Sequence, residues 1–505
     1  MKSLFRATAI LSGSSAVSIV LGLASSRVLA TILHPSGYGY YGLLQSLVTV
    51  ASLLCGMGMA TGLVRLGAGA AKQNDCTTMA SLCGGAWLLV ALLGTPVLIV
   101  FALFRASISS WALGTPDHAG AILIMGVTLL FSVSMNIQNG ILNAWHRVEA
   151  LAKYGIVNSV INAVTGILGV LFWRERGVVP AILASAILGW AASRYFLYRS
   201  VGAVRIRTTF HQKLAAARKL LAFGAPYTAS VMAGNGIQLA MPMVVVHLLN
   251  ADGVGYYKAA TAISVGYLGF LVAAMTQDYY PRVSAVRDQP RLLISIINEQ
   301  HRLIMLLAAP IILCALALVP YLVPLVYSRR FMPAVDILEW QLIGDFFRFS
   351  SWTLSFAILA RCKPSMYFLT ESLSGIITLS TTWIAVRLFV LQGLGIGFIV
   401  ANVLYCCVVW IVLRRELPLK WTAYNRNLLL ASLAAAFTIR LLPITPLAHF
   451  RTLIALILTG AFGAYSVRAL WSEYQEDRVH NSTSRPTTSL PTANLPVVTG
   501  SEAEV

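Results

Sequence analysis

The sequence predicts an all-α polytopic membrane protein with about fourteen transmembrane helices: two parallel six-helix lobes plus two C-terminal helices. Three observations predict it: the composition, the spacing of the apolar runs and an internal repeat. Of the 505 residues, 58% are apolar and 11% charged, whereas soluble proteins carry about 45–50% and about 25%. The mean hydropathy of +0.76 excludes a soluble globule.

Apolar runs long enough to cross the roughly 30 Å hydrocarbon core give the second observation. The thirteenth is short, because Pro443 and Pro446 prevent a helix from continuing. The predicted spans cover residues 8–33, 40–64, 79–103, 119–143, 154–173, 179–198, 221–249, 254–279, 303–326, 335–360, 367–386, 393–413, 428–439 and 452–467.

Loop charge predicts the orientation. Of the 37 Lys and Arg residues, four lie in predicted spans, 25 lie in the N-terminus and alternate loops, and eight lie in the opposite loops. Cytoplasmic loops hold the basic excess. We therefore expect both termini in the cytoplasm.

An internal repeat supports the two lobes. Gly37, Gly39, Tyr40 and Tyr41 recur 216 residues later as Gly253, Gly255, Tyr256 and Tyr257, and Gly177 recurs as Gly393. Because each copy holds an even number of spans, both face the same way, as in a parallel repeat. The predicted parts are a first lobe (1–199), a basic cytoplasmic linker (200–220), a second lobe (221–415), the last two helices (416–471) and a disordered tail (472–505).

Ionisable residues inside spans are candidate sites, because a charge is costly in hydrocarbon. Arg348 lies at the middle of its span, and Asp345 lies three residues earlier on nearly the same helix face. A salt bridge that only supports packing and a role in substrate or proton chemistry are equally compatible with this pair.

Other polar residues complete the candidate substrate site. Arg27 lies roughly opposite a stripe of small residues on its helix, which favours a position in a cavity. Lys258 begins the corresponding helix of the second repeat, where an interfacial anchor is the alternative. The full predicted substrate-binding set, more cationic than acidic and so suited to an anion, is Arg27, Lys258, Asp345, Arg348, Asn139, Asn235 and Gln238.

Several classes of function lack their signatures. The seven cysteines show no paired spacing for disulfides or zinc, and no Walker A motif or paired GxGxxG is found. A membrane glycosyltransferase, polymerase or ligase needs acidic or His residues in a sizeable outer loop, whereas the longest predicted outer loop, residues 104–118, is short and offers only Arg105, Asp117 and His118. We expect a transporter rather than an enzyme, with no metal, no cofactor and no nucleic-acid partner.

The first outer turn resembles a family pattern. Residues 33–41 (LHPSGYGYY) are similar to the turn between the first two helices of Wzx-type polysaccharide flippases, in the MOP superfamily of lipid II flippases and MATE exporters. The glycine- and alanine-rich helix starts at 177–185 and 393–401, and the stretch 280–284, also resemble that family. Departures are His34 and Asn250 where the family has glycine, and Met241-Pro242 where an acidic residue often occurs.

The resemblance implies a flippase that moves an undecaprenyl-pyrophosphate-linked oligosaccharide across the inner membrane by alternating access, for polysaccharide export. A lipid II flippase or a MATE-like exporter of the same superfamily is the alternative, and a membrane polymerase or ligase is a distant one. The expected partners are the lipid-linked oligosaccharide, membrane lipids, and a polysaccharide polymerase with its export machinery. A proton or sodium gradient is the candidate energy source.

Overall fold

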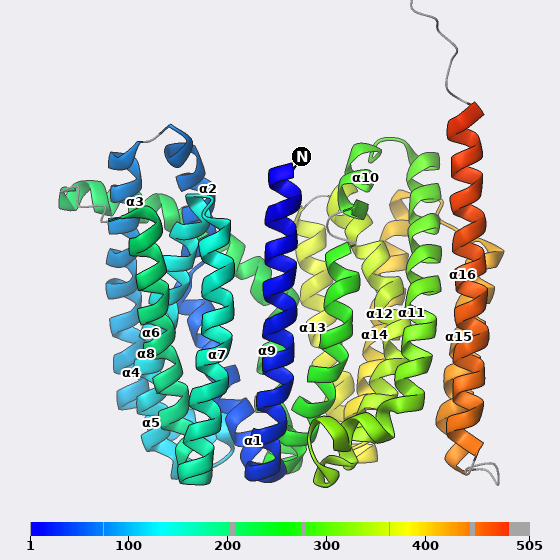
Figure 1. Ribbon diagram of the computed structural model, residues 1–505, viewed down its shortest axis with the longest axis horizontal. Coiled ribbons are helices and arrows are strands. Elements are labelled where there is room, and N and C mark those ends of the chain that lie inside the picture. Colours follow the sequence, from blue (N-terminus) through cyan, green and yellow to red (C-terminus); the bar gives the residue numbers. More distant parts are fainter. Residues whose placement is uncertain are drawn as a thin grey trace, which may run out of the picture.

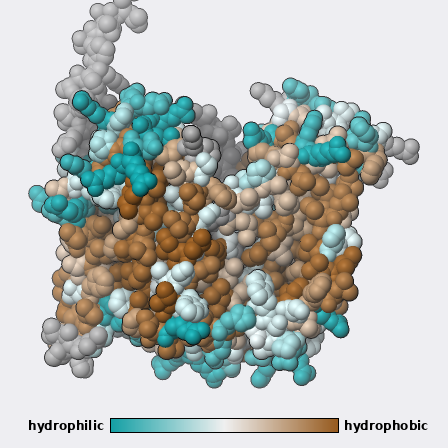
Figure 2. Space-filling view, turned by 180° about the vertical axis from the view of Figure 1, so that it is seen from behind, coloured by the Kyte–Doolittle hydropathy of each residue, from teal (hydrophilic) through white to brown (hydrophobic). Residues whose placement is uncertain are grey.

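A computed structural model describes residues 2–73, 75–202, 208–274, 278–362, 364–444 and 450–483. The described residues form helices joined by short turns, with no strand among them, so the predicted all-α fold is confirmed. Eight helical stretches of the described chain are long and apolar enough to cross a membrane, and two of these hold two predicted spans each. On the face that Figure 2 shows, a broad apolar band lies between hydrophilic surfaces at the two ends of the molecule.

The first repeat contains eight α-helices. A five-residue π-helix, Val90–Gly94, joins two of them within the predicted third span. The helices are α1 (Lys2–Gly56), α2 (Met59–Lys72), α3 (Cys76–Leu89), α4 (Thr95–Leu103), α5 (Arg105–Leu113), α6 (Ala119–Ala144), α7 (Val148–Trp173) and α8 (Val178–Val201). Helix α5 lies in the stretch predicted to be an outer loop. It buries Ser109, Ala112 and Leu113, whose spacing places them on one face of the helix.

The second repeat begins with one long helix and continues to the C-terminal pair. The helices are α9 (Phe210–Ala274), α10 (Tyr280–Ala285), α11 (Pro290–Val326), α12 (Pro333–Arg361), α13 (Pro364–Phe389), α14 (Gly393–Glu416), α15 (Ala423–Leu441) and α16 (Arg451–Thr483). In Figure 1, α2–α8 and α10–α16 form two groups of upright helices, and α1 stands between them.

The structure adds helices at two of the predicted boundaries. The segment predicted as a linker is helical from Phe210, and this start of α9 packs on α3, since a methyl group at Gly85 would stand 2.7 Å from the backbone nitrogen of Ala217. Helix α16 continues to Thr483, so the first residues of the predicted disordered tail are helical. Residues 484–505 lie outside the described part.

The repeat is visible in the backbone. Helix α1 bends at His34 (φ 59°) and α9 bends at Asn250 (φ 75°), positions 216 residues apart. Arg174 (φ 49°) and Val390 (φ 50°) form a second pair at the same offset. Left-handed backbone is uncommon for residues other than glycine, so its recurrence at two matched positions confirms the two parallel copies.

The two bends touch each other at one end of the molecule. A methyl group at Gly39 would stand 2.1 Å from the carbonyl oxygen of Ala251, and one at Gly255 would stand 2.1 Å from that of Pro35. The contact is symmetric, because Pro35 and Ala251 are also matched positions. The lobes therefore close on each other at this end, whereas Figure 2 shows the surface hollowed between the two halves at the opposite end.

Candidate functional site

A cavity lined by asparagines lies between α6 and the first part of α9. Its volume is about 480 Å³, and its wall includes Asn136, Asn139 and Asn143 of α6 and Tyr227 of α9. The spacing of three and four residues places these amides on one face of the helix. Ligand sites commonly have this size and a few convergent polar groups. An amide both donates and accepts hydrogen bonds, so this wall suits a ligand rich in hydroxyl or amide groups.

Close helix packing sets the position of this wall. A methyl group at Gly140 would stand 2.9 Å from the carbonyl oxygen of Ala60, so α2 and α6 are in backbone contact. Asn139 is fixed from the other side, because the Ser193 hydroxyl of α8 donates to its Oδ1 at 3.1 Å. Asn136 is exposed to the cavity. The structure thus places one predicted site residue, Asn139, in a cavity, and adds Asn136 and Asn143 beside it.

Asp345 and Arg348 meet in the core of the second lobe. Arg348 Nη1 lies 3.8 Å from Asp345 Oδ1, and the Asp345 side chain is fully buried. The Ser264 hydroxyl of α9 donates to Asp345 Oδ2 at 3.3 Å. The guanidinium carbon of Arg348 lies 4.7 Å from the centre of the Trp352 ring and 5.6 Å from that of Phe398. Each charge is compensated within the lobe, which favours a packing role for the pair.

Lys258 links the two lobes near their closed end. Its Nζ donates to the Ser46 hydroxyl of α1 at 2.8 Å. Its aliphatic stem lies against Gly42, which is its own counterpart in the first repeat, and a methyl group there would stand 2.9 Å from Lys258 Cγ. The ammonium group is therefore held at the contact between the lobes in this conformation.

Arg27 has an exposed side chain on α1. Elsewhere on this helix, Ser18 contacts α7, since the Ser159 hydroxyl donates to the Ser18 hydroxyl at 2.7 Å. Among the described contacts, none joins Arg27 to Lys258 or Arg348, and Arg348 pairs with Asp345 instead. The side chains of the predicted site residues Asn235 and Gln238 lie outside the described residues.

Two ionic groups escaped the sequence analysis because they lie near span ends. Glu371 of α13 accepts hydrogen bonds from the Ser355 hydroxyl at 2.9 Å and the Tyr405 hydroxyl at 2.5 Å, so three helices of the second lobe meet at one carboxylate. Only Tyr405, deep in its span, offered a signal, since a buried phenol usually finds a polar partner.

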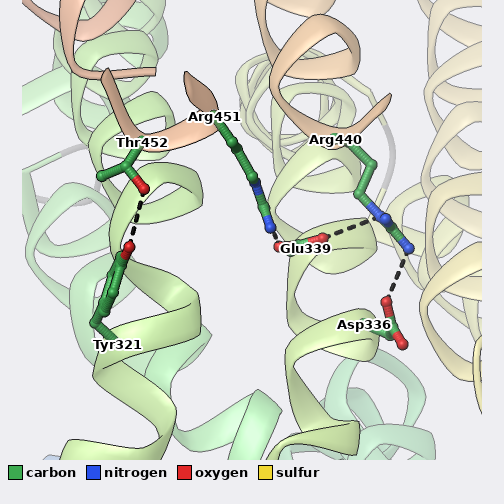
Figure 3. A network of polar contacts seen from close by, with 6 residues as sticks. All are labelled: Tyr321, Asp336, Glu339, Arg440, Arg451 and Thr452. Atoms are coloured by element: carbon green, nitrogen blue, oxygen red, sulfur yellow. Dashed lines mark hydrogen bonds and ion pairs between the residues drawn. The ribbon is translucent and has the colours of Figure 1, made fainter. Parts of the chain in front are cut away.

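The second missed group joins the C-terminal helices to the second lobe (Figure 3). Glu339 of α12 is 2% exposed and pairs with Arg440 of α15, at 3.0 Å, and with Arg451 of α16. Arg440 also reaches Asp336 at 2.9 Å. The sequence signal was the placement of these acids and bases at the same predicted side of the membrane. The network fixes α15 and α16 onto α12.

The chain is similar to several known membrane proteins in sequence and in fold. The lipid III flippase of Escherichia coli (strain K12) is 22% identical over 382 residues, which cover 73% of this chain and 88% of that protein. The solved structure of the lipid II flippase MurJ in an inward closed conformation has a TM-score of 0.69 at 13% identity and covers 91% of this chain and 99% of its own. An inward-facing MATE multidrug transporter of the MOP superfamily has a TM-score of 0.65 at 15% identity, over 79% of this chain and 94% of its own.

The solved structures share the fold of this chain, which defines its class as a multi-pass, all-α membrane protein. The model of one family, described as polysaccharide biosynthesis protein, matches residues 28–336, which is more than half of the chain. The chain belongs to this family. The resemblance to polysaccharide flippases seen in the first outer turn is therefore confirmed.

Proposed function

We propose that the protein is a flippase that moves an undecaprenyl-pyrophosphate-linked oligosaccharide across the bacterial inner membrane, for polysaccharide export. The asparagine-lined cavity carries the proposal, because the neutral amides of α6, in a cavity that α9 also lines, suit the hydroxyl groups of a saccharide. The family and the lipid III flippase relative support a lipid-linked saccharide as cargo. The anionic pyrophosphate would be met by the exposed cation Arg27.

The mechanism that fits is alternating access of the two lobes. They close at the His34 and Asn250 bends and separate at the other end. With both termini in the cytoplasm, as the loop charges predict, this conformation would accept cargo from the cytoplasmic leaflet. Separation of the two lobes at the bends would then expose the cavity to the outer leaflet. We propose a proton gradient as the energy source, with Glu371 as the proton carrier, because its carboxylate joins three helices of one lobe.

Transport of the lipid-linked oligosaccharide by the purified protein in proteoliposomes tests the proposal directly. The expected result is appearance of the oligosaccharide in the opposite leaflet, accessible to an added glycosidase. Arg27→Ala should abolish this transport, and Arg27→Lys should retain part of it, because a point charge still attracts phosphate. Matched protein levels of the three forms are the control.

The other members of the superfamily define the alternative outcomes. Transport of lipid II, or export of a cationic dye, with no movement of the lipid-linked oligosaccharide would favour a lipid II flippase or a MATE-like exporter, and the MurJ and MATE folds make these the second candidates. Extension of the saccharide chain by the purified protein would contradict the transporter assignment and favour a polymerase.

A further inference from the structure

A second cavity lies at the closed end of the molecule. Its volume is about 740 Å³, and it is lined both by the first repeat, at the bend of α1, and by Asn250 and Ala251 at the bend of α9. It is separate from the asparagine-lined cavity, since the two share no lining residue. We refer to it as the bend pocket.

The bend pocket has an apolar floor and an aromatic wall. Leu43, Leu113 and Val246 line the floor. On the wall, the Tyr40 ring lies beside the His118 ring, with centroids 4.6 Å apart and planes inclined by 41°. A ring face carries negative charge density that attracts the weakly positive C–H groups of a ligand. The wall thus suits a ligand that presents a face of C–H bonds.

The rim of the bend pocket is polar and charged. Glu175 and Arg176 come from the turn before α8, and Ser36 and Asn250 come from the two bends. The Glu175 carboxylate reaches over Gly37, where a methyl group would stand 3.2 Å from its Oε1. A carboxylate accepts several hydrogen bonds, and a guanidinium donates up to five in a fixed plane. The rim can therefore satisfy a ring of hydroxyl groups.

The second repeat shows that this pocket does not follow from the fold alone. Tyr256, the counterpart of Tyr40, meets the fully buried ring of Phe331 at 6.1 Å. The counterparts of Glu175 and Arg176 are Leu391 and Gln392, without charge. The matched place in the second repeat is thus filled by an aromatic side chain, whereas the first repeat keeps an open pocket with charged groups around it.

We propose that the bend pocket is a binding site for one sugar ring of a saccharide on the outer side, and that this ring holds the lobes closed at that end. A sugar ring combines a face of C–H groups with a rim of hydroxyls, which matches the aromatic wall and the charged rim. The proposal rests on the proposed function for the source of the sugar, which is the exported saccharide.

The closing effect follows from the position of the pocket. Its wall includes both bends, and Gly39 and Gly255 hold these bends in backbone contact. Opening the outer end would separate Asn250 from Tyr40 and divide the site. A ligand that binds one conformation better shifts the population toward it. Saccharide accumulating outside would therefore favour the conformation that faces the cytoplasm.

Saturation-transfer NMR on the full chain in nanodiscs, free of detergents with sugar headgroups, tests the binding. The probes are glucose, galactose and N-acetylglucosamine, with sorbitol as an acyclic polyol of similar hydroxyl content. We expect transfer to at least one ring sugar and much less to sorbitol. Arg176→Ala, Glu175→Gln and Tyr40→Leu should each weaken binding about tenfold, the effect of losing one good contact. Gln392→Ala, at the matched exposed position of the second repeat, should leave it unchanged.

Equal signals from sorbitol and the ring sugars, or unchanged binding in Arg176→Ala and Glu175→Gln, would overturn the proposal. These two residues are exposed, so their variants should fold even if Tyr40→Leu does not. In proteoliposomes, a ring sugar added on the pocket side should slow transport by the natural protein and not by Arg176→Ala. Sugar binding that depends on Arg176 in a protein unable to move the lipid-linked oligosaccharide would contradict the proposed function and leave the bend pocket standing.

Discussion

The asparagine-lined cavity of the first lobe presents neutral amides and hydroxyls, whereas the interior of the second lobe holds ionisable groups among its neutral polar ones. Asn136, Asn139 and Asn143 represent the first kind, and the Asp345–Arg348 pair and Glu371 represent the second. The backbone of the two lobes is nevertheless repeated down to the left-handed residues at the bends. The difference indicates that the two copies kept a common backbone while their interior side chains diverged.

The largest effect should come from the contact that the two lobes share equally. Gly39→Ala and Gly255→Ala each place a methyl group 2.1 Å from a backbone carbonyl oxygen of the opposite bend. Backbone atoms cannot yield as a flexible side chain can. We therefore expect each variant to lower the transport rate at least about tenfold, since misplacing functional groups by about 1 Å has effects of at least this size. Both should increase impermeant labelling of a cysteine placed at Ala251.

Gly22→Ala is the matched control for this contact, since open space surrounds Gly22 on the same helix. It should transport normally. A large effect of one bend glycine with none from its counterpart would show that the closure is not symmetric.

The buried charges of the second lobe should give the next largest effect. Asp345→Asn leaves the Arg348 guanidinium without its carboxylate in the core, and breaking a buried pair costs about 3–5 kcal/mol. The double variant Asp345→Asn/Arg348→Gln should recover much of that loss, which melting temperatures of the purified protein can measure. A double variant that is stable but inactive would assign Arg348 to transport chemistry.

An ion pair of the first lobe serves as the control. Glu149 and Lys153 lie 2.8 Å apart with side chains more than 60% exposed. Surface pairs of this kind contribute about 0–1 kcal/mol, so Glu149→Gln should change the melting temperature little. A destabilisation as large as that of Asp345→Asn would remove the contrast between the lobes.

In the first lobe, we expect substitution of a cavity asparagine to affect cargo binding. Asn139→Leu removes the partner of the Ser193 hydroxyl and one hydrogen-bonding group of the cavity. We expect an apparent affinity for the lipid-linked saccharide about tenfold weaker, since a lost hydrogen bond typically costs about 1–1.5 kcal/mol, with transport at saturating cargo nearly kept. Asn162→Leu on α7, whose amide donates to the Asn158 carbonyl on its own helix, is the control.

The sequence predicted the architecture because lipid imposes long apolar runs and because the repeat preserved its turn residues. His34 and Asn250 replace the glycine of the family, yet both keep the left-handed bend. The site was predicted less well. Asn139 and the Asp345–Arg348 pair could be found from depth and helix spacing, whereas the partner of Lys258 lies 212 residues away in the chain and those of Glu371 lie on two other helices. No local pattern encodes such contacts, and the bend pocket depends on four separate segments.

The smallest effect should come from an aspartate at the membrane edge of the first lobe, which contrasts with buried Asp345. Asp75 caps α3, and its Oδ1 accepts from the Thr77 and Thr78 backbone nitrogens at 3.0 Å each and from the Thr77 hydroxyl at 2.6 Å. These hydrogen bonds to the charged form hold the pKa of Asp75 below its ordinary value of 3.8. The stabilisation is therefore complete above that value and is lost only as the pH falls below it.

Between pH 5 and 8 we expect Asp75→Ala to speed hydrogen exchange at Thr77 and Thr78 by a constant factor, with Asp75→Ser as the conservative control and with transport unchanged. An exchange factor that varies across this pH range, or a fall in melting temperature as large as that of Asp345→Asn, would mean that the cap is coupled to the core. The contrast between the exposed charge of Asp75 and the buried charge of Asp345 would then be lost.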